Sequence, residues 1–366
     1  GKIGGTLKGT CYDMYNMVRW ANQQGYSNIS YFTDKCHNGQ AVIGEEDWSV
    51  ATPLLERKAK VTKEGLRAAF AWLVDDACPG DSLLFHYTGH GTFVQYEAKD
   101  KKKGQDECNG KDEALYLPIA FNKAWGWDKY ADKVYYTDDE LFTDLVARVP
   151  ARAHLFAIVD ACHSGTVLDL PWNWMSQKYY WSCPHNTDQR KYTDSQFVWE
   201  WAKPPEKLGR TYPLDGTVTL ITGSQNTQTS GDGVMTQVRD ANGVLQNVGG
   251  LMTYRLILDH ADHANPRQLN PPILDTAMRE KWSWAKTIAE LVKQVAGSEE
   301  LVTSKNKQIP NFGASHRLDM SRAFGLDNSA FASPPSSSDP ASASKLQCDT
   351  GAWMREKRKL KAPGCA

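Results

Sequence analysis

Two short stretches of the chain hold residue types that could carry out nucleophilic catalysis: HYTGHG at residues 86–91 and VDACHSG at residues 159–165. His90 lies three residues past Tyr87, where one apolar run ends, and Cys162 lies three residues past Val159, where another ends. A cysteine becomes a nucleophile when a neighbouring base takes its proton, and backbone N–H groups hold the oxyanion that forms on attack. If the two runs are parallel strands of one sheet, His90 and Cys162 meet at the same edge and can form such a pair.

Two other interpretations of these residues stay open. A cysteine at a strand end is commonly a small buried hydrophobic residue, and a histidine beside glycines is commonly a loop residue. A zinc site is the second alternative, because His86 and His90 are four residues apart and His163 follows Cys162. That spacing gathers two imidazoles on one face of a helix. Here it falls on a strand and a turn, which disfavours zinc.

The elements that must position these residues alternate between strand-like and helix-like patterns. Five apolar runs bounded by turn residues predict buried strands: 28–32, 82–87, 114–119, 154–159 and 217–222. Five amphipathic stretches predict helices: 12–24, 62–77, 137–149, 250–263 and 282–296. Strand and helix in alternation indicate an α/β fold, with a mostly parallel central sheet and helices on both faces. Such sheets bind ligands at the carboxyl ends of their strands.

Composition narrows the class of protein. The chain has 366 residues, of which 41% are hydrophobic, so it can bury a large core. Its formal net charge of −1 gives no electrostatic reason to expect nucleic acid or an anionic membrane as a partner. We find no apolar run long enough to span a membrane and no signal-peptide core in the opening GKIGGTLKG. Eight scattered cysteines without a CxxC pair favour free thiols and an intracellular, cytoplasmic location.

The two motifs also resemble a known family. DSLLFHYTGHGT and VDACHSGTVLDLP resemble the histidine and cysteine motifs of metacaspases, the caspase-like cysteine peptidases of plants, fungi and protists. LKGTCYDMYNM, GKDEALYLP, ITGSQNTQTSGD and GGLMTYRLI extend the likeness over roughly residues 5 to 325. Ser224 and Asn226 stand where the family often has Cys and Asp, and no apolar strand precedes Leu7.

The resemblance implies a caspase-hemoglobinase-like fold with the regions in the type I order. It divides the chain into a large-subunit-like catalytic region at 1–171, an aromatic and basic connection at 172–210, a small-subunit-like region of the same domain at 211–327, and a Ser/Pro-rich linker with a basic tail at 328–366. It also implies a monomer that acts on proteins or peptides, without nucleic acid or membrane partners.

The resemblance assigns catalytic and specificity roles residue by residue. It makes His90 the base and Cys162 the nucleophile, and gives the oxyanion hole to the N–H groups of Gly91 and Cys162. Cleavage after Arg or Lys would follow from an acidic pocket formed by Asp13 and Asp160, with Thr88 adding a hydroxyl, because two carboxylates bind a guanidinium and repel an acidic side chain. Without the resemblance, the two aspartates read as a solvated helix start and a buried hydrogen-bonded carboxylate.

A calcium site is the third implication of the resemblance. The positions that match its ligands are Asp112, Asp138, Asp139 and Asp169, and oxygen ligands drawn from separate loops suit Ca²⁺. The sequence TDDE at 137–140 is also a capping box that would explain Asp138 and Asp139 without metal.

The chain has candidate sites for self-cleavage, and a scaffold role is the alternative to peptidase activity. Basic stretches at 97–104 and in the 172–210 connection are candidate sites of self-cleavage. A catalytically idle caspase-like fold that only binds partners is the rival function, and the intact Cys–His pair argues against it.

Overall fold

The computed structural model describes residues 7, 9–32, 61–95, 111–118, 126–176, 197–201, 214–226, 228–239, 245–257, 274, 282–296, 308–322 and 324. Its helices are α1 (Thr10–Gln23), α3 (Lys63–Val74), α4 (Gly126–Val134), α5 (Asp138–Asp144), α7 (Leu251–Ile257) and α9 (Trp284–Ala296), with a 3₁₀ turn at Val146–Arg148. Its strands are β1 (Ser82–Thr88), β2 (Gly91–Gln95), β3 (Lys111–Tyr116), β4 (Tyr135–Thr137), β5 (His154–Asp160), β6 (Trp172–Ser176), β7 (Phe197–Trp201), β8 (Thr217–Thr222), β9 (Asp232–Arg239), β10 (Leu245–Gly250) and β11 (Asn311–Ala314).

A six-stranded sheet in the order β1-β5-β8-β11-β6-β7 forms the centre of the described structure. The pairs β1·β5 and β5·β8 are parallel, and the pairs β8·β11, β11·β6 and β6·β7 are antiparallel. Strands β1, β5, β8 and β6 therefore run in one direction. The predicted α/β class with a mostly parallel central sheet is confirmed, although the half of the sheet beyond β8 is mixed.

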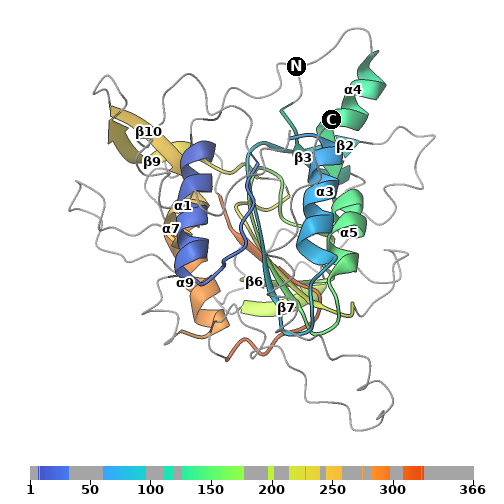
Figure 1. Ribbon diagram of the computed structural model, residues 1–366. Coiled ribbons are helices and arrows are strands. Elements are labelled where there is room, and N and C mark those ends of the chain that lie inside the picture. The colour runs from blue at the N-terminus through green and yellow to red at the C-terminus, as the bar shows by residue number, and fades with distance from the viewer. Residues whose placement is uncertain are drawn as a thin grey trace, which may run out of the picture.

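Helices cover both faces of this sheet, as predicted. Figure 1 shows α1, α7 and α9 on one face, and α3 and α5 on the other. Each face has its own core, since Phe156 and Ile158 of β5 pack toward α1, α7 and α9, while Leu155 and Ala157 pack with residues of α3 and α5. Every residue of β5 and β8 is buried, as the continuous apolar runs required.

Local sequence signals set where the helices begin. The Thr62 side chain accepts a hydrogen bond from the Gly65 N–H and caps α3, whose residues Leu66 and Phe70 are buried. Thr137 and Glu140 form a complete capping box at the start of α5.

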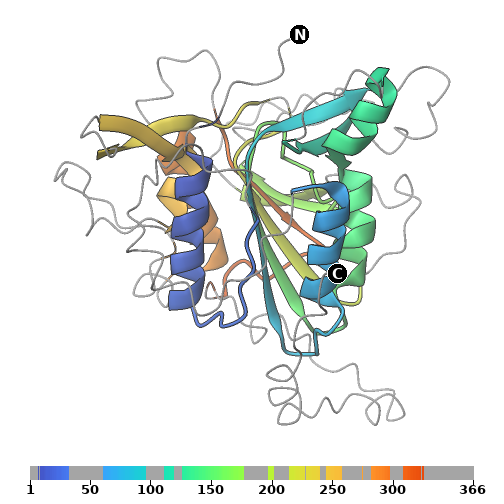
Figure 2. The same cartoon turned by 45° about the horizontal axis from the view of Figure 1, so that its top comes forward.

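Two of the five predicted strands need correction. Residues 28–32 form no strand; Ile29 packs partly buried against the core, so this apolar run reflects burial without sheet pairing. The run at 114–119 overlaps β3, which belongs to a separate antiparallel sheet in the order β2-β3-β4. Figure 2 shows β2 and β3 rising beyond the end of the central sheet. Periodicity alone does not reveal which sheet a buried strand joins.

The connection at 172–210 contributes two strands, since β6 and β7 form a hairpin that extends the central sheet. The remainder of this connection, the basic stretch at 97–104 and the tail at 328–366 lie outside the described residues. No helix among the described residues is long and apolar enough to cross a membrane. Cys162 is a free thiol, whereas Cys78 is disulfide-bonded, so the expectation of free thiols is wrong at Cys78.

Candidate active site

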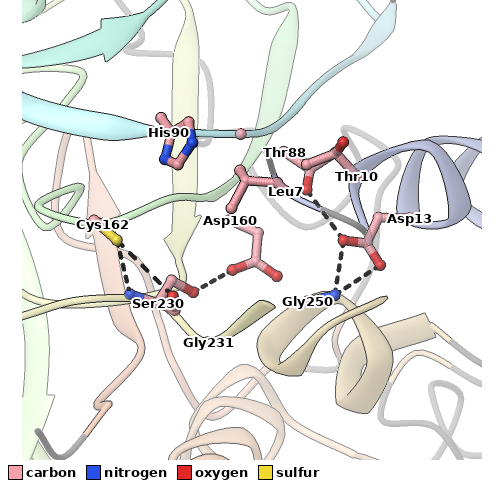
Figure 3. A pocket seen from close by; sticks show the side chains of 11 residues that line it. Leu7, Thr10, Asp13, Thr88, His90, Asp160, Cys162, Ser230, Gly231 and Gly250 are labelled. Carbon is pink, nitrogen blue, oxygen red and sulfur yellow. Dashed lines mark hydrogen bonds between the residues drawn. The ribbon is translucent and has the colours of Figure 1, made fainter. Parts of the chain in front are cut away.

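The pairing of β1 with β5 brings the two motifs together. Thr88, the last residue of β1, is the register partner of Asp160, the last residue of β5, and the Gly89 N–H donates to the Asp160 carbonyl at 3.3 Å. His90 and Cys162 each follow two residues later. Both line one pocket at the carboxyl ends of these strands. Figure 3 shows them at the same end of that pocket, with Asp13 at the other end and Asp160 between.

The backbone beside Cys162 requires a glycine at position 91. A Cβ atom on Gly91 would overlap the carbonyl oxygen of Cys162, so β2 can begin against the main chain of Cys162 only if its first residue has no side chain. On its other side, the turn that follows β5 is tied to the segment after β8. The Ser164 and Ser224 hydroxyls both donate to the Ala161 carbonyl, at 2.7 and 3.0 Å, and the His163 N–H donates to the Gln228 carbonyl at 2.9 Å.

The thiol of Cys162 is partly buried and faces Ser230. The Ser230 N–H donates to Cys162 Sγ at 3.3 Å. Burial raises the pKa of the Cys162 thiol, the negative charge of Asp160 adds to this, and the Ser230 N–H opposes it. A thiol with a raised pKa needs a base close by, and the imidazole of His90 lines the same pocket. The Tyr87 hydroxyl donates to the His90 carbonyl at 2.8 Å and fixes the turn that carries this imidazole.

Two buried carboxylates form the far part of the pocket. Asp13, in the first turn of α1, accepts the Gly250 N–H at 3.0 and 2.8 Å on its two oxygens and the Thr88 hydroxyl at 3.1 Å. Asp160 accepts the N–H and the hydroxyl of Thr253 at 2.9 and 2.8 Å and the hydroxyl of Ser230. All three residues assigned to substrate binding, Asp13, Asp160 and Thr88, therefore line the same pocket as His90 and Cys162.

Gly250 lies between the two carboxylates. A Cβ atom there would overlap Asp160 Oδ2 and would lie 2.9 Å from Asp13 Oδ2. Because Gly250 has no side chain, the carboxylates of Asp13 and Asp160 both face the same part of the pocket, where one cationic group could contact both.

Several pocket residues escaped sequence reasoning. Ser230, Gly231 and Gly250 line the pocket, and Thr253 and Gln308 hold its walls by hydrogen bonds. They come from segments far along the chain from both motifs. Only Gln308 had a signal in the sequence, because it is a polar residue directly before the strand-like run IPNFGA.

Ser224 and Asn226, which depart from the family's usual residues, do not line the pocket. Ser224 is buried against Ala161, and the Asn226 side-chain amide donates to the Thr166 hydroxyl at 2.7 Å. Both support the turn that carries Cys162.

The four candidate calcium ligands lie on β3, at the start of α5 and in the segment before β6. Asp112, Asp138 and Asp169 are buried, but the described residues hold no group of three His, Cys, Asp or Glu side chains placed to bind a metal ion. The two oxygens of Asp138 accept the N–H groups of Glu113 and Asp139, at 3.2 and 2.9 Å. Asp138 thus lies in the first turn of α5, directly after the Thr137 cap, as the capping box predicted, and the calcium site stays a prediction.

The zinc alternative fails on the positions of the three histidines. His86 does not line the pocket of His90, and burial lowers the pKa of its imidazole to about 3. His163 is turned toward the Asn226 carbonyl, with Nδ1 at 2.7 Å.

Comparisons with known proteins agree with this geometry. A family model described as the metacaspase, peptidase C14 domain matches residues 2–171. Metacaspase-1 of Arabidopsis thaliana is 34% identical over 171 residues, which is 47% of this chain and 38% of that protein. Metacaspase-1B of Neurospora crassa is 40% identical over 173 residues, which is 47% of this chain and 33% of that protein.

The matches thus span less than half of the length of these relatives. Among solved structures, a protein from Geobacter sulfurreducens is similar at 18% identity and a TM-score of 0.38, covering 76% of this chain and 86% of that one. Over residues 2–171 this chain is thus similar to metacaspases, and the matched region contains both His90 and Cys162.

Proposed function

We propose that this protein is a cysteine endopeptidase in which Cys162 is the nucleophile and His90 the general base. The observation that carries the proposal is that both residues follow in-register partners on adjacent parallel strands and line one pocket. The metacaspase relationship supports a peptidase that acts on peptide bonds.

The proposed reaction proceeds through a thioester. His90 takes the thiol proton as Cys162 Sγ attacks the scissile carbonyl carbon, and the N–H groups of Gly91 and Cys162 hold the oxyanion. When the tetrahedral intermediate collapses, the C–N bond breaks and the leaving amine receives the proton from His90. Water, deprotonated by His90, then attacks the thioester and releases the acid product and the thiol.

Specificity for Arg or Lys before the scissile bond is the second part of the proposal. Asp13 and Asp160 are buried, are oriented by donors from three segments, and open onto the same space. A guanidinium between them would form charge-assisted hydrogen bonds, whereas an acidic side chain would face two negative charges.

Hydrolysis of matched peptides tests both parts. Peptides that end in Arg, Lys, citrulline or Asp are compared with wild type, Cys162→Ala and His90→Ala. Rapid cleavage of the Arg and Lys peptides, with turnover lost in both variants, supports the proposal. Preference for Asp, or activity in Cys162→Ala, would refute it. Binding of basic peptides with no turnover by freshly reduced wild type would favour the idle scaffold.

Calcium dependence, self-cleavage and a monomeric state are proposed from the family resemblance alone. Calorimetry with Ca²⁺ on the chelator-treated protein, repeated with Asp169→Asn, tests binding directly, and peptide hydrolysis with and without Ca²⁺ tests dependence. Absence of binding heat together with unchanged hydrolysis would remove calcium from the proposal. Intact mass after Ca²⁺ addition reports self-cleavage, and light scattering reports the oligomeric state.

A further inference from the structure

Gln308 is a buried residue that belongs to neither motif, yet it touches the wall of the pocket. It precedes β11, and its exposed fraction is 0%. Its Oε1 accepts the Gly231 N–H at 2.8 Å, and its Nε2 donates to the Gly223 carbonyl and to the Ser230 hydroxyl, both at 2.8 Å. Both ends of the amide are therefore used, as burial of an amide requires.

These partners fix which way the amide faces. If the oxygen and nitrogen of the amide were exchanged, the oxygen would face the Gly223 carbonyl and the NH₂ group would face the Gly231 N–H. Two acceptors and two donors would then face each other, and neither hydrogen bond could form. With Nε2 toward Ser230, the serine hydroxyl can only accept from Gln308. Its single proton is then directed to Asp160 Oδ1. The result is one directed chain of hydrogen bonds from Gln308 through Ser230 to the Asp160 carboxylate.

Ser230 contacts both the Cys162 thiol and the Asp160 carboxylate. Its backbone N–H donates to Cys162 Sγ at 3.3 Å, while its hydroxyl holds Asp160, as the dashed lines in Figure 3 show. The proposed nucleophile and one proposed specificity carboxylate thus depend on the placement of one residue.

The packing around this chain leaves little freedom. A Cβ atom on Gly223 would lie 2.5 Å from Asp160 Oδ1 and 2.6 Å from Ser230 Oγ. Gly223 thus makes room for their contact, and its carbonyl anchors the Gln308 amide. Three segments, after β5, after β8 and before β11, therefore meet at Ser230.

We propose that Gln308 is a positioning residue of the active site, which holds Ser230 so that its N–H faces the Cys162 thiol and its hydroxyl orients Asp160. The expected effect on peptide cleavage rests on the proposed peptidase function, whereas the expected effect on the reactivity of the Cys162 thiol does not. If Gln308 only stabilised the fold, its replacement in a protein with an unchanged melting temperature would alter neither the reactivity of Cys162 nor the binding of a basic substrate.

The test compares Gln308→Met with Gln228→Met. Gln228 is a matched control, because its side-chain oxygen also accepts nearby backbone N–H groups, from Gln225 and Ile309 at 3.3 and 3.0 Å, but no contact of its side chain with Ser230 Oγ, Asp160 or the thiol is seen among the described residues. Ser230→Ala is the third variant, since it keeps the backbone N–H and removes the hydroxyl.

The first measurement is the rate of Cys162 alkylation by iodoacetamide against pH, followed by mass spectrometry of the peptide that contains Cys162. The charged or titratable groups that share the pocket with the thiol are His90, Asp160 and Asp13, and all variants retain them. We expect the profile of Gln308→Met to move to higher pH, with alkylation at neutral pH about tenfold slower, because a hydrogen bond to the thiolate is weakened. Gln228→Met and Ser230→Ala should keep the wild-type profile.

The second measurement is the kinetics of Arg-peptide cleavage. KM should rise about tenfold in Ser230→Ala with kcat nearly unchanged, because Asp160 loses a donor. Both KM and kcat should worsen in Gln308→Met. The inference is overturned if Gln308→Met matches wild type in both measurements, or if Gln228→Met changes them equally.

Two safeguards keep the outcome decisive. If Gln308→Met does not fold, Ser230→Ala still tests the directed chain, and an unchanged KM in that variant would overturn it. If wild type cleaves no peptide, the proposed function fails, while the alkylation profiles still decide whether Gln308 positions the thiol environment.

Discussion

Thr88 and Asp160 are register partners at the ends of two parallel strands, and His90 and Cys162, which follow them, line the same pocket. Each motif residue lies two positions past one of these partners. A slip of one residue between β1 and β5 would turn the side chains of one strand to the other face. The observed register therefore decides which residues of the two motifs come to the same edge of the sheet.

Replacing Asp160 with Asn should separate specificity from thiol reactivity. Loss of one charge-assisted contact should lower kcat/KM for an Arg peptide by about 10- to 100-fold, and the ratio of Arg to citrulline cleavage should fall with it. Alkylation of Cys162 should shift to lower pH, because the charge of Asp160 raises the pKa of that thiol. Asp13→Asn serves as the comparison, with the same loss of specificity. An unchanged Arg-to-citrulline ratio in both variants would contradict the acidic pocket.

A methyl group at Gly250 should impair substrate binding. In Gly250→Ala the new Cβ would displace Asp160 and crowd Asp13, so KM for Arg peptides should rise at least about tenfold. Steady-state kinetics measures this, and alkylation of Cys162 at neutral pH is the control for an intact nucleophile. A variant with wild-type KM would show that the two carboxylates do not act on one substrate group.

Gly91→Ala should be far more damaging than Gly89→Ala. The first Cβ would overlap the main-chain oxygen of Cys162, whereas the second meets only the distal end of the Tyr87 side chain, whose displacement would weaken its hydrogen bond to the His90 carbonyl. We expect Gly91→Ala to lose about 1–3 kcal/mol of unfolding free energy together with most peptide hydrolysis. Urea denaturation and hydrolysis rates measured side by side check this. Equal losses in the two variants would contradict the close approach of β2 to the nucleophile.

His86 should make the fold sensitive to acid. Its pKa is lowered to about 3 because its imidazole is buried, and its Nε2 has no hydrogen-bond partner among the described residues. As pH falls below about 6.5, the unfolded chain binds a proton at this residue that the folded chain does not, so stability falls with pH. Between pH 8 and pH 5, wild type should lose up to about 2 kcal/mol more than His86→Leu. Denaturant titrations at both pH values measure this, and parallel pH dependence in the two proteins would refute it.

The sequence was sufficient to predict the parts of the site that follow from strand ends. The apolar runs before His90 and Cys162 became β1 and β5, and the rule that parallel strands share a carboxyl edge placed both residues together. Thr62 and the capping box at Thr137 likewise marked helix starts from local chemistry.

Other parts of the site depend on long-range packing that no local pattern encodes. Ser230 and Gly250 line the pocket, and Gln308 is hydrogen-bonded to Ser230, because the segments after β8, before α7 and before β11 converge there. Their own neighbours in sequence carry no catalytic signature. The run at 28–32 looked like a strand because its side chains are apolar, yet burial and backbone pairing are separate properties.

The position of β8 next to β5 has a consequence for a severed chain. β8 lies in the second half of the molecule, yet it is paired along its whole length with β5 from the first half, from His154↔Thr217 to Val159↔Thr222. A single backbone break between Ser176 and Phe197 would leave that ladder and both hydrophobic cores in place. The two fragments would stay associated under native conditions and separate only in denaturant. A nicked molecule would therefore have the same hydrodynamic radius as an intact one.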